Sequence, residues 1–205
     1  FLLTHPLSSS RISDAFNAAE NLSSEGTKRD SLEFSLMKAR LEIYYENIPS
    51  NSLRNFKERF NKNPSDSNKY GLALAYQKNN QYKQSIALIE NLISLYPKNL
   101  VLNNTKIDIL LDYGEYENAL NLANEFLEIS PRNYPLSISK SKILLAMKKY
   151  FESEEIIRDQ LLRKNSNPEL WLLLSEIQRS SKNIIGYHQS RAEYFLLLGQ
   201  NERAV

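Results

Sequence analysis

Residues 114–120 read GEYENAL, and this short stretch decides the fold. Gly114 suits a tight turn, because glycine adopts left-handed backbone conformations without a steric penalty. After the turn, Tyr116, Ala119 and Phe126 recur with the spacing of one helix face. The rest of the chain carries leucine-rich patterning of the same period and contains only five glycines in 205 residues. The pattern predicts an all-helical chain in which GEYENAL joins two antiparallel helices.

Prolines mark a repeat on both sides of this stretch, at separations of 33, 34 and 37 residues. They are Pro64, Pro97, Pro131 and Pro168. Each closes a segment of similar texture, such as LIENLISLYP and ANEFLEISP. A period of this length indicates a solenoid of helical hairpins. A single hairpin buries too little apolar surface to be stable alone, so stacking of neighbours supplies the core.

The repeat resembles the tetratricopeptide repeat (TPR), a unit of 34 residues made of two antiparallel helices. With the prolines at repeat position 32, large and small side chains fall where the motif expects them. In the segment from Asp66 these are Leu72, Ala73, Tyr76, Ser85 and Ile89. Tyr150, Ser153 and Trp171 fit in the same way further along. The resemblance covers about residues 30–205 and implies an all-α, right-handed TPR superhelix of four to five hairpins, preceded by a short extra N-terminal helix.

The same phase divides the chain into a leading segment, residues 1–29, and an array, residues 30–205. The expected repeats are 33–65, 66–99, 100–133, 134–167 and 168–205. The first is atypical, because Arg40 occupies a position that favours a small residue. The last is expected to be incomplete, since FLLLGQNERAV is typical of a turn followed by the start of another second helix.

Local chemistry predicts the helix boundaries. Asp30 is expected to cap the first helix, and Pro49 to end it. Ser50 or Asn51 is expected to cap the second helix. The pair Asn79–Asn80, like Gly114, suits a turn between helices.

Composition limits the classes of function. The 26 basic and 24 acidic residues are interspersed, which argues against a nucleic-acid partner. The apolar runs are too short to span a bilayer. The absence of cysteine excludes disulfides and thiolate chemistry.

We find no catalytic constellation in the sequence, so we expect no enzyme activity from it. His5 and His188 are isolated from each other, and no H-E-x-x-H sequence is present. His188 is more typical of a surface or packing residue. The neighbouring Glu154 and Glu155 lie beside Ile156 and Ile157, which is typical of a solvated helix face.

A protein-binding groove is the remaining candidate site. By repeat phase, several side chains fall on the first-helix face that lines the concave groove of a TPR solenoid. They are Tyr44, Tyr70, Gln77, Asn104, Asp108, Lys142, Glu176 and Arg179. The set lacks the cationic clamp with which some TPR domains hold an acidic C-terminus, and Asp108 would repel such a ligand. Binding of an extended or helical peptide, or of a folded partner, stays open.

The first residues form a separate segment, out of phase with the repeats. A serine run caps an amphipathic stretch that carries Ile12, Phe16 and Leu22. The sequence LLTHPLSSSRI resembles a segment that closes the peptidase domain of HExxH zinc metallopeptidases of the HtpX and BepA type. In BepA-like periplasmic proteases (β-barrel assembly-enhancing proteases), a TPR domain follows directly. The matching positions are Thr4, His5, Pro6 and Arg11.

The resemblance implies that residues 1–29 are the tail of a peptidase domain plus a linker. It also implies that the array is a non-catalytic interaction domain of a periplasmic zinc metalloprotease. The partners would be the outer-membrane β-barrel assembly machinery or its stalled substrates. His5 would be a regulatory zinc ligand in the parent protein, while the chain itself would need no cofactor. The alternative is a free-standing TPR adaptor, cytoplasmic and without a protease domain.

Overall fold

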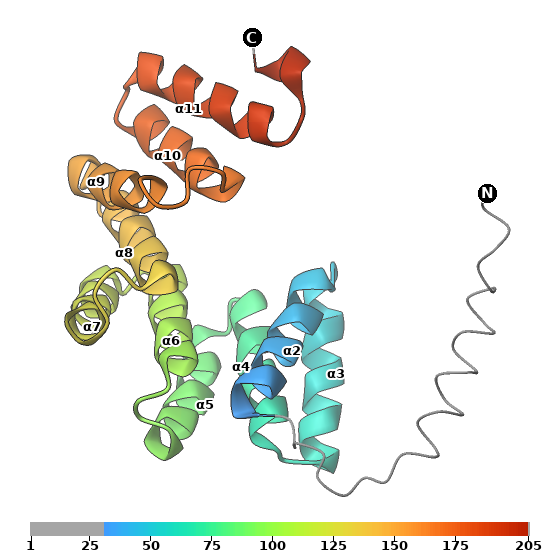
Figure 1. The fold of residues 1–205 in the computed structure, drawn as a ribbon. Helices are drawn as coiled ribbons and strands as arrows, with labels where there is room; N and C mark the ends of the chain where they lie inside the picture. Colours follow the sequence, from blue (N-terminus) through green and yellow to red (C-terminus); the bar gives the residue numbers. More distant parts are fainter. Residues whose placement is uncertain (1–30, 205) are drawn as a thin grey trace, which may run out of the picture. The chain divides into compact units, whose positions relative to one another are not determined.

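The computed structural model describes residues 31–204, which contain ten α-helices, one short 3-10 helix and no β-strand. The expected segment 1–29, with its extra helix and His5, lies outside the described residues, and so does Asp30, the expected cap of the first helix of the array. The helices follow one another as five hairpins from α2 (blue) to α11 (red) in Figure 1. In four of them the two helices pack against each other, whereas in the first α2 and α3 both pack against α4. The all-α TPR-like superhelix of four to five hairpins is therefore confirmed, with five.

Each hairpin consists of a first and a second helix of 12 to 14 residues. The first helices are α2 (Leu32–Tyr45), α4 (Asp66–Lys78), α6 (Leu100–Tyr113), α8 (Tyr134–Ala146) and α10 (Pro168–Ser180). The second helices are α3 (Pro49–Lys62), α5 (Tyr82–Leu95), α7 (Tyr116–Ile129), α9 (Tyr150–Leu161) and α11 (Ile184–Leu197).

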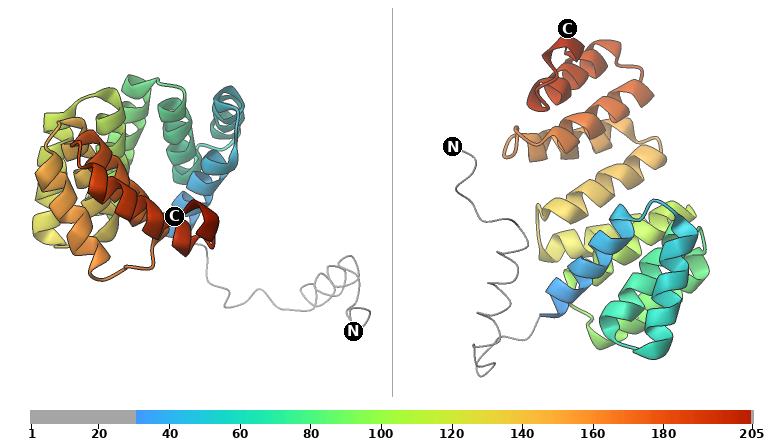
Figure 2. Two further views of the ribbon diagram at one scale, coloured as in Figure 1. Left: turned by 90° about the horizontal axis from the view of Figure 1, so that it is seen from above. Right: turned by 90° about the vertical axis from the view of Figure 1, so that its right-hand side faces the viewer.

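The helices stack through a repeated set of contacts within residues 32–204. Each second helix packs against the first helix of the next hairpin, and first helices also contact each other, as α2 does α4 and α6 does α8. Two further views show the hairpins curving in an arc (Figure 2). No helix among residues 31–204 is both long enough and apolar enough to span a bilayer.

The turns inside hairpins two to five share one geometry. Each contains a residue with a positive φ: Asn80 (59°), Gly114 (88°), Lys148 (62°) and Lys182 (63°). The next residue donates its backbone N–H to a carbonyl five residues back, as Glu115 does to Leu110 at 2.9 Å. This is the Schellman closure of a helix, which favours glycine or asparagine at the left-handed position. The turns predicted at Asn79–Asn80 and Gly114 are confirmed, whereas nothing in the sequence indicated the two lysines.

Small residues let the two helices of a hairpin approach each other. The Ser85 hydroxyl donates to the Ala73 carbonyl oxygen at 2.7 Å. In the fourth hairpin, Ser153 donates to the Ser141 carbonyl at 2.8 Å, and the two hydroxyls lie 2.9 Å apart. All four residues are buried, so the seams of the second and fourth hairpins are closed by small side chains and satisfied hydrogen bonds.

The core is divided into three clusters that overlap along the array. The first includes Leu36, Leu74 and Ile109, the second includes Ile107 and Ile143, and the third joins α9 to α10. Helix α6 contributes to both the first and the second cluster. Helix α6 therefore joins the packing of the first two clusters, while α9 and α10 supply the buried residues of the third.

The first hairpin corrects one boundary prediction. We expected Ser50 or Asn51 to cap the second helix, but α3 begins at Pro49, and Ile48 at its N-cap makes no side-chain capping bond. Proline is favoured in the first turn because its fixed φ suits a helix and its missing N–H has no helical partner there. Pro49 therefore starts α3, while α2 already ends at Tyr45.

The fifth hairpin corrects two further predictions. Residues 168–205 do not hold an incomplete repeat, because α10 and α11 are both complete and the FLLL sequence continues α11 to Leu197. The chain leaves α11 only at Gly199, whose φ of 71° ends the helix. Pro168 lies in the first turn of α10 rather than after a second helix. It is not the counterpart of Pro97 and Pro131, since α9 is short and its connection to α10 is long.

Candidate protein-binding groove

A hydrogen-bond network joins the first helices α2, α4 and α6. The Arg40 guanidinium donates to the Tyr70 hydroxyl from Nε at 3.1 Å and from Nη2 at 2.9 Å. Nη2 also donates to Thr105 Oγ1 at 2.6 Å. The Tyr70 and Thr105 hydroxyls lie 2.9 Å apart, and Thr105 donates to the Val101 carbonyl at 2.7 Å. One arginine thus reaches two neighbouring repeats.

Tyr70 therefore belongs to the inside of the array. Its side chain is 0% exposed, although repeat phase placed it on the accessible wall of the groove. That prediction is wrong for this residue, because the Arg40 guanidinium and the α6 hydroxyl cover its ring and its hydroxyl group.

Arg40 itself is half-buried, and no acidic side chain of residues 31–204 lies at ion-pair distance from it. Both of its acceptors are neutral hydroxyls, and no ion pair is formed by Arg40 within residues 31–204. Nη1 donates to no group in this part of the chain.

Asp108 lies one turn along α6 from Asn104 and Thr105. Its carboxylate accepts from Ser139 Oγ on α8 at 2.6 Å and from Asn104 Nδ2 at 3.3 Å. Burial raises the pKa of Asp108 above its ordinary value, while the Ser139 hydrogen bond and the charges of Arg40 and Lys142 oppose that rise. Asp108 is a part-buried acid held between two first helices.

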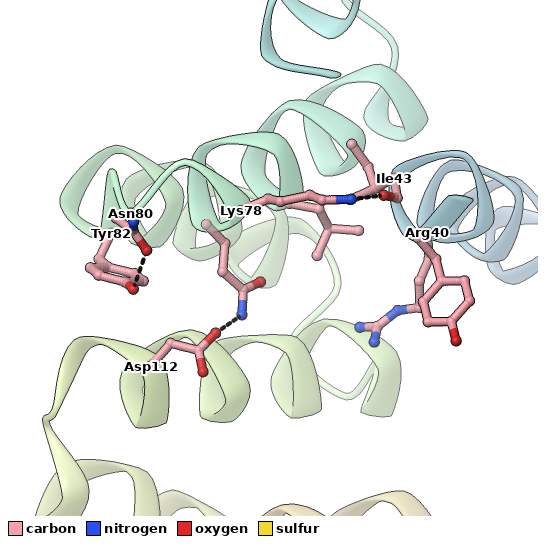
Figure 3. A pocket seen from close by; sticks show the side chains of 9 residues that line it. Arg40, Ile43, Lys78, Asn80, Tyr82 and Asp112 are labelled. Atoms are coloured by element: carbon pink, nitrogen blue, oxygen red, sulfur yellow. Dashed lines mark hydrogen bonds between the residues drawn. The ribbon is translucent and has the colours of Figure 1, made fainter. Parts of the chain in front are cut away.

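A first hollow, of about 530 Å³, lies beside this network and is called the Tyr44 hollow here (Figure 3). Its lining comes from α2, α4 and α6, from the turn after α4 and from the start of α5. These residues are Arg40, Ile43, Tyr44, Leu74, Gln77, Lys78, Asn80, Tyr82 and Asp112. Figure 3 shows Arg40 reaching from α2 towards α6, the helix that carries Asp112. Gln77 donates to Asp112 at 2.7 Å, and the Lys78 ammonium donates to the Ile43 and Glu46 carbonyls at the end of α2.

Two more hollows continue along the first helices. The Val101 hollow, of about 320 Å³, lies between α2 and the first turns of α6 and α8. It is lined by Met37, Arg40, Leu100, Val101, Asn104, Asn133 and Pro135. The Lys142 hollow, of about 330 Å³, lies between α8 and α10. It is lined by Tyr134, Ile138, Lys142, Glu169, Leu170, Leu172, Leu173 and Glu176.

The structure distributes the other predicted groove residues over these hollows. Tyr44, 74% exposed, and Gln77 line the first, Asn104 lines the second, and Lys142 and Glu176 line the third. Arg179 is exposed on α10 but lines none of the three.

Sequence reasoning missed Arg40 as a groove residue, together with its partner Thr105 and with Ser139 and Asp112. One signal was available, since Arg40 did not fit the small-residue position it occupies. Thr105 and Ser139 gave no such signal, because serine and threonine are also typical of positions that need a small packing residue.

No group of three or more histidine, aspartate or glutamate side chains in residues 31–204 is arranged to hold an ion. His188 is exposed, and its ring lies edge-on to Tyr187 with the centroids 5.0 Å apart.

Residues 110–177, from the end of α6 into α10, match the tetratricopeptide repeat family model. The fold is that of a TPR protein. The TPR array resembles TTC0263, a thermophilic TPR protein of Thermus thermophilus, with a TM-score of 0.68 at 16% identity, over 85% of this chain and 95% of that one. It also resembles YrrB, a TPR protein with an unusual peptide-binding site, with a TM-score of 0.54 at 14% identity, over 93% and 95% of the two chains.

MamA from Desulfovibrio magneticus RS-1 is a further structural relative, with a TM-score of 0.55 at 12% identity, over 82% of this chain and 96% of that one. At these identities the likeness is one of fold. No curated protein sequence matches the chain.

Proposed function

We propose that the TPR array binds a peptide segment of a partner protein along its first helices. The observation that carries this proposal is the row of three hollows, which lie on consecutive first helices and combine apolar side chains with a few charged and amide groups. Pockets of this composition are typical ligand sites, in which apolar surface gives affinity and a few polar groups fix orientation. YrrB, which has the same fold, is described as having a peptide-binding site.

The chain offers a direct test, because it contains no cysteine. Single cysteines at the rims of the hollows (Tyr44→Cys, Pro135→Cys, Glu176→Cys) can each carry a photo-crosslinker. Matched controls are Asn121→Cys and Glu128→Cys, which are exposed on the second helix α7. The probes are short synthetic peptides that the wild-type chain retains from a library of random peptide sequences.

We expect crosslinks from the rim positions and background labelling from α7. Crosslinks concentrated at Asn121 and Glu128 would overturn the proposal and place binding on the second helices. The proposal would also be overturned if no peptide of the library bound to the chain.

We further propose, from residues 2–12, that the array belongs to a BepA-like periplasmic zinc metalloprotease that acts in outer-membrane β-barrel assembly. The peptide ligand would then be part of the assembly machinery or of a stalled substrate. His5 would be a regulatory zinc ligand of the parent protein. The residues present are consistent with a non-catalytic role for the array itself.

A free-standing TPR adaptor in the cytoplasm is the second candidate, and the same fold supports it equally. The gene decides between the two. An H-E-x-x-H sequence encoded upstream of Phe1, behind a signal peptide, is expected for the protease, and a reading frame without it would leave the adaptor.

A further inference from the structure

The turns after α8 and α10 form an edge of the array that is both basic and apolar. A hollow of about 530 Å³ lies between them, with Phe151 and Ser181 among its lining residues. Close to these turns, the Gln178 amide of α10 donates to the Glu154 carboxylate of α9 at 3.1 Å, which ties the two hairpins together. Three lysines and three large apolar side chains lie on the turns and at the starts of α9 and α11, and they are called the Phe151 edge here. They are Lys148, Lys149, Phe151, Lys182, Ile184 and Ile185.

The apolar side chains of the Phe151 edge protrude from the surface. Phe151 is 75% exposed, Ile184 59% and Ile185 74%, and none of the three packs against a core cluster. Large apolar side chains gathered in one patch mark an interaction surface, whereas single ones are ordinary. Protruding side chains can enter a lipid bilayer without a matching pocket, which a protein partner would have to supply.

The lysines give the edge a net positive charge. Within residues 31–204, none of the three forms an ion pair. Two acidic residues also line the hollow, but Glu154 is paired with Arg158 at 2.6 Å, so Glu152 is the one acid there without an ion pair. An edge of this composition is complementary to a surface that is apolar inside and negatively charged outside.

Two of the lysines occupy positions that favour glycine. Lys148 and Lys182 have φ angles of 62° and 63°, a left-handed conformation that a β-carbon disfavours. Gly114 fills the equivalent position after α6, in a turn that carries Asp112 and Glu115 instead of lysines. Because residues strained in this way concentrate at functional sites, the two lysines point to a use for their charge on this edge.

We propose that the Phe151 edge binds the surface of an anionic lipid bilayer. Its phenylalanine and isoleucines enter the boundary between headgroups and acyl chains, and its lysines bind lipid phosphates with their ammonium groups while their stems lie along the apolar surface. Each lysine near an anionic surface strengthens binding by about fivefold. The inference goes beyond the proposed function, because no residue of the edge lines the three hollows of the groove.

Vesicle flotation of the purified chain tests this proposal. The vesicles consist of phosphatidylcholine alone or of phosphatidylcholine mixed with phosphatidylglycerol. We expect the wild-type chain to float with the anionic vesicles and not with the neutral ones, and to be released by high salt, which screens charges at the surface. Equal binding to both kinds of vesicle, or binding to neither, would overturn the proposal.

The apolar contribution is measured with a double variant, Phe151→Ser with Ile185→Ser. It should bind the anionic vesicles about tenfold more weakly, because two protruding side chains no longer enter the bilayer. The matched control is Ile129→Ser with Leu162→Ser, which removes side chains of similar exposure, 72% and 87%, at the far ends of α7 and α9. If the two double variants bind equally, the edge is not inserted and the proposal fails.

The charge contribution is measured with Lys148→Gly combined with Lys182→Gly. This variant removes two charges and relaxes both turns, so weaker binding cannot be attributed to a loss of folding. We expect binding to fall by about 25-fold, which is fivefold for each lysine. Lys62→Gln with Lys98→Gln is the control, since both lysines are exposed outside the edge and the net charge changes by the same amount. Equal losses would indicate a general effect of net charge and overturn the proposal.

An acidic polypeptide is the other class of partner that a basic edge could bind. Retention on immobilised polyglutamate that the two glycine substitutions abolish, without flotation, would overturn the lipid proposal and assign the edge to a protein partner. Flotation and peptide crosslinking are independent measurements. Failure of flotation leaves the groove proposal intact, and failure of crosslinking at the groove rims leaves the Phe151 edge intact.

Discussion

The Tyr70 hydroxyl is shared by side chains from two other first helices. It accepts two hydrogen bonds from Arg40 and lies 2.9 Å from the Thr105 hydroxyl. We expect Tyr70→Phe to destabilise the chain by about 1–3 kcal/mol, because the half-buried Arg40 guanidinium loses one of its two acceptors while the ring is kept. Urea unfolding measures the loss. Tyr113→Phe is the control, since that ring is partly exposed and none of the hydrogen bonds described for its helix involves its hydroxyl; an equal loss in both variants would contradict the prediction.

Asp108 makes the stability of the folded chain depend on pH. Because its pKa is raised by burial, the folded state binds more protons than the unfolded state above the ordinary value of 3.8. The contribution of Asp108 to stability is therefore largest at low pH and falls as pH rises through the raised pKa. Arg40 and Lys142 favour the charged form, and Asp112 disfavours it, so burial decides the direction.

Asp108→Asn should remove that dependence, because the amide oxygen still accepts from Ser139 but carries no charge. We expect the variant to gain stability relative to the wild type as pH rises from about 4 towards neutrality. The free energy of unfolding of both proteins, measured in urea across this range, checks the sign. A flat difference would show that the pKa of Asp108 is the same in the folded and the unfolded state, and a difference that moves in favour of the wild type would show that the folded state prefers the carboxylate.

At the scale of the helices, two turns carry backbone strain that substitution by glycine would relieve. Lys148 and Lys182 adopt positive φ angles in the Schellman turns after α8 and α10, where Gly114 serves without strain after α6. A residue with a β-carbon is disfavoured in this conformation by about 1–2 kcal/mol. We expect Lys148→Gly and Lys182→Gly each to raise the free energy of unfolding by about 1 kcal/mol. Lys149→Gly is the matched control, because Lys149 has a φ of −85° and gains nothing from glycine.

Helix α4 approaches α3 closely enough to require glycine in its interior. A β-carbon on Gly71 would lie 2.0 Å from Cε1 of Phe56, whose ring is buried and has little room to move. Alanine normally stabilises a helix interior by about 0.5–1 kcal/mol relative to glycine. Here we expect Gly71→Ala to destabilise the chain by about 1–3 kcal/mol through overpacking.

A second substitution identifies the cause. Phe56→Leu should recover part of the loss when combined with Gly71→Ala, and thermal unfolding of the single and double variants measures this coupling. Simple additivity of the two losses would exclude the ring as the origin of the clash.

For the array as a whole, the repeat period can be predicted from the sequence, but the side-chain contacts between helices of different repeats cannot. Leucine-rich patterning and the recurring prolines predict the hairpins, because both are local consequences of helix packing and helix termination. Arg40 shows the limit: its misfit was visible, while its acceptors lie 30 and 65 residues away along the chain. The groove residues were predicted by phase alone, and phase does not report that Tyr70 is covered by a neighbouring repeat.

The division of the core predicts how the array unfolds. Helix α6 supplies Leu102 and Ile109 to the first cluster and Ile107 and Leu110 to the second, whereas α10 belongs to the third alone. In a solenoid, stability is approximately a sum of repeat terms and nearest-neighbour terms. Removing side chains from α6 should therefore weaken hairpins on both sides, and removing them from α10 should weaken one end.

Ile107→Ala and Leu174→Ala compare these positions, since both side chains are almost fully buried and each truncation should cost about 2–5 kcal/mol. In native-state hydrogen exchange, we expect Leu174→Ala to lower amide protection in α10 and α11 while α4 to α6 stay protected. Ile107→Ala should lower protection from α4 to α8 together, because it removes contacts at the centre of the array. Uniform loss of protection in both variants would mean that residues 32–204 unfold as one cooperative unit, and the nearest-neighbour description would then not apply to this chain.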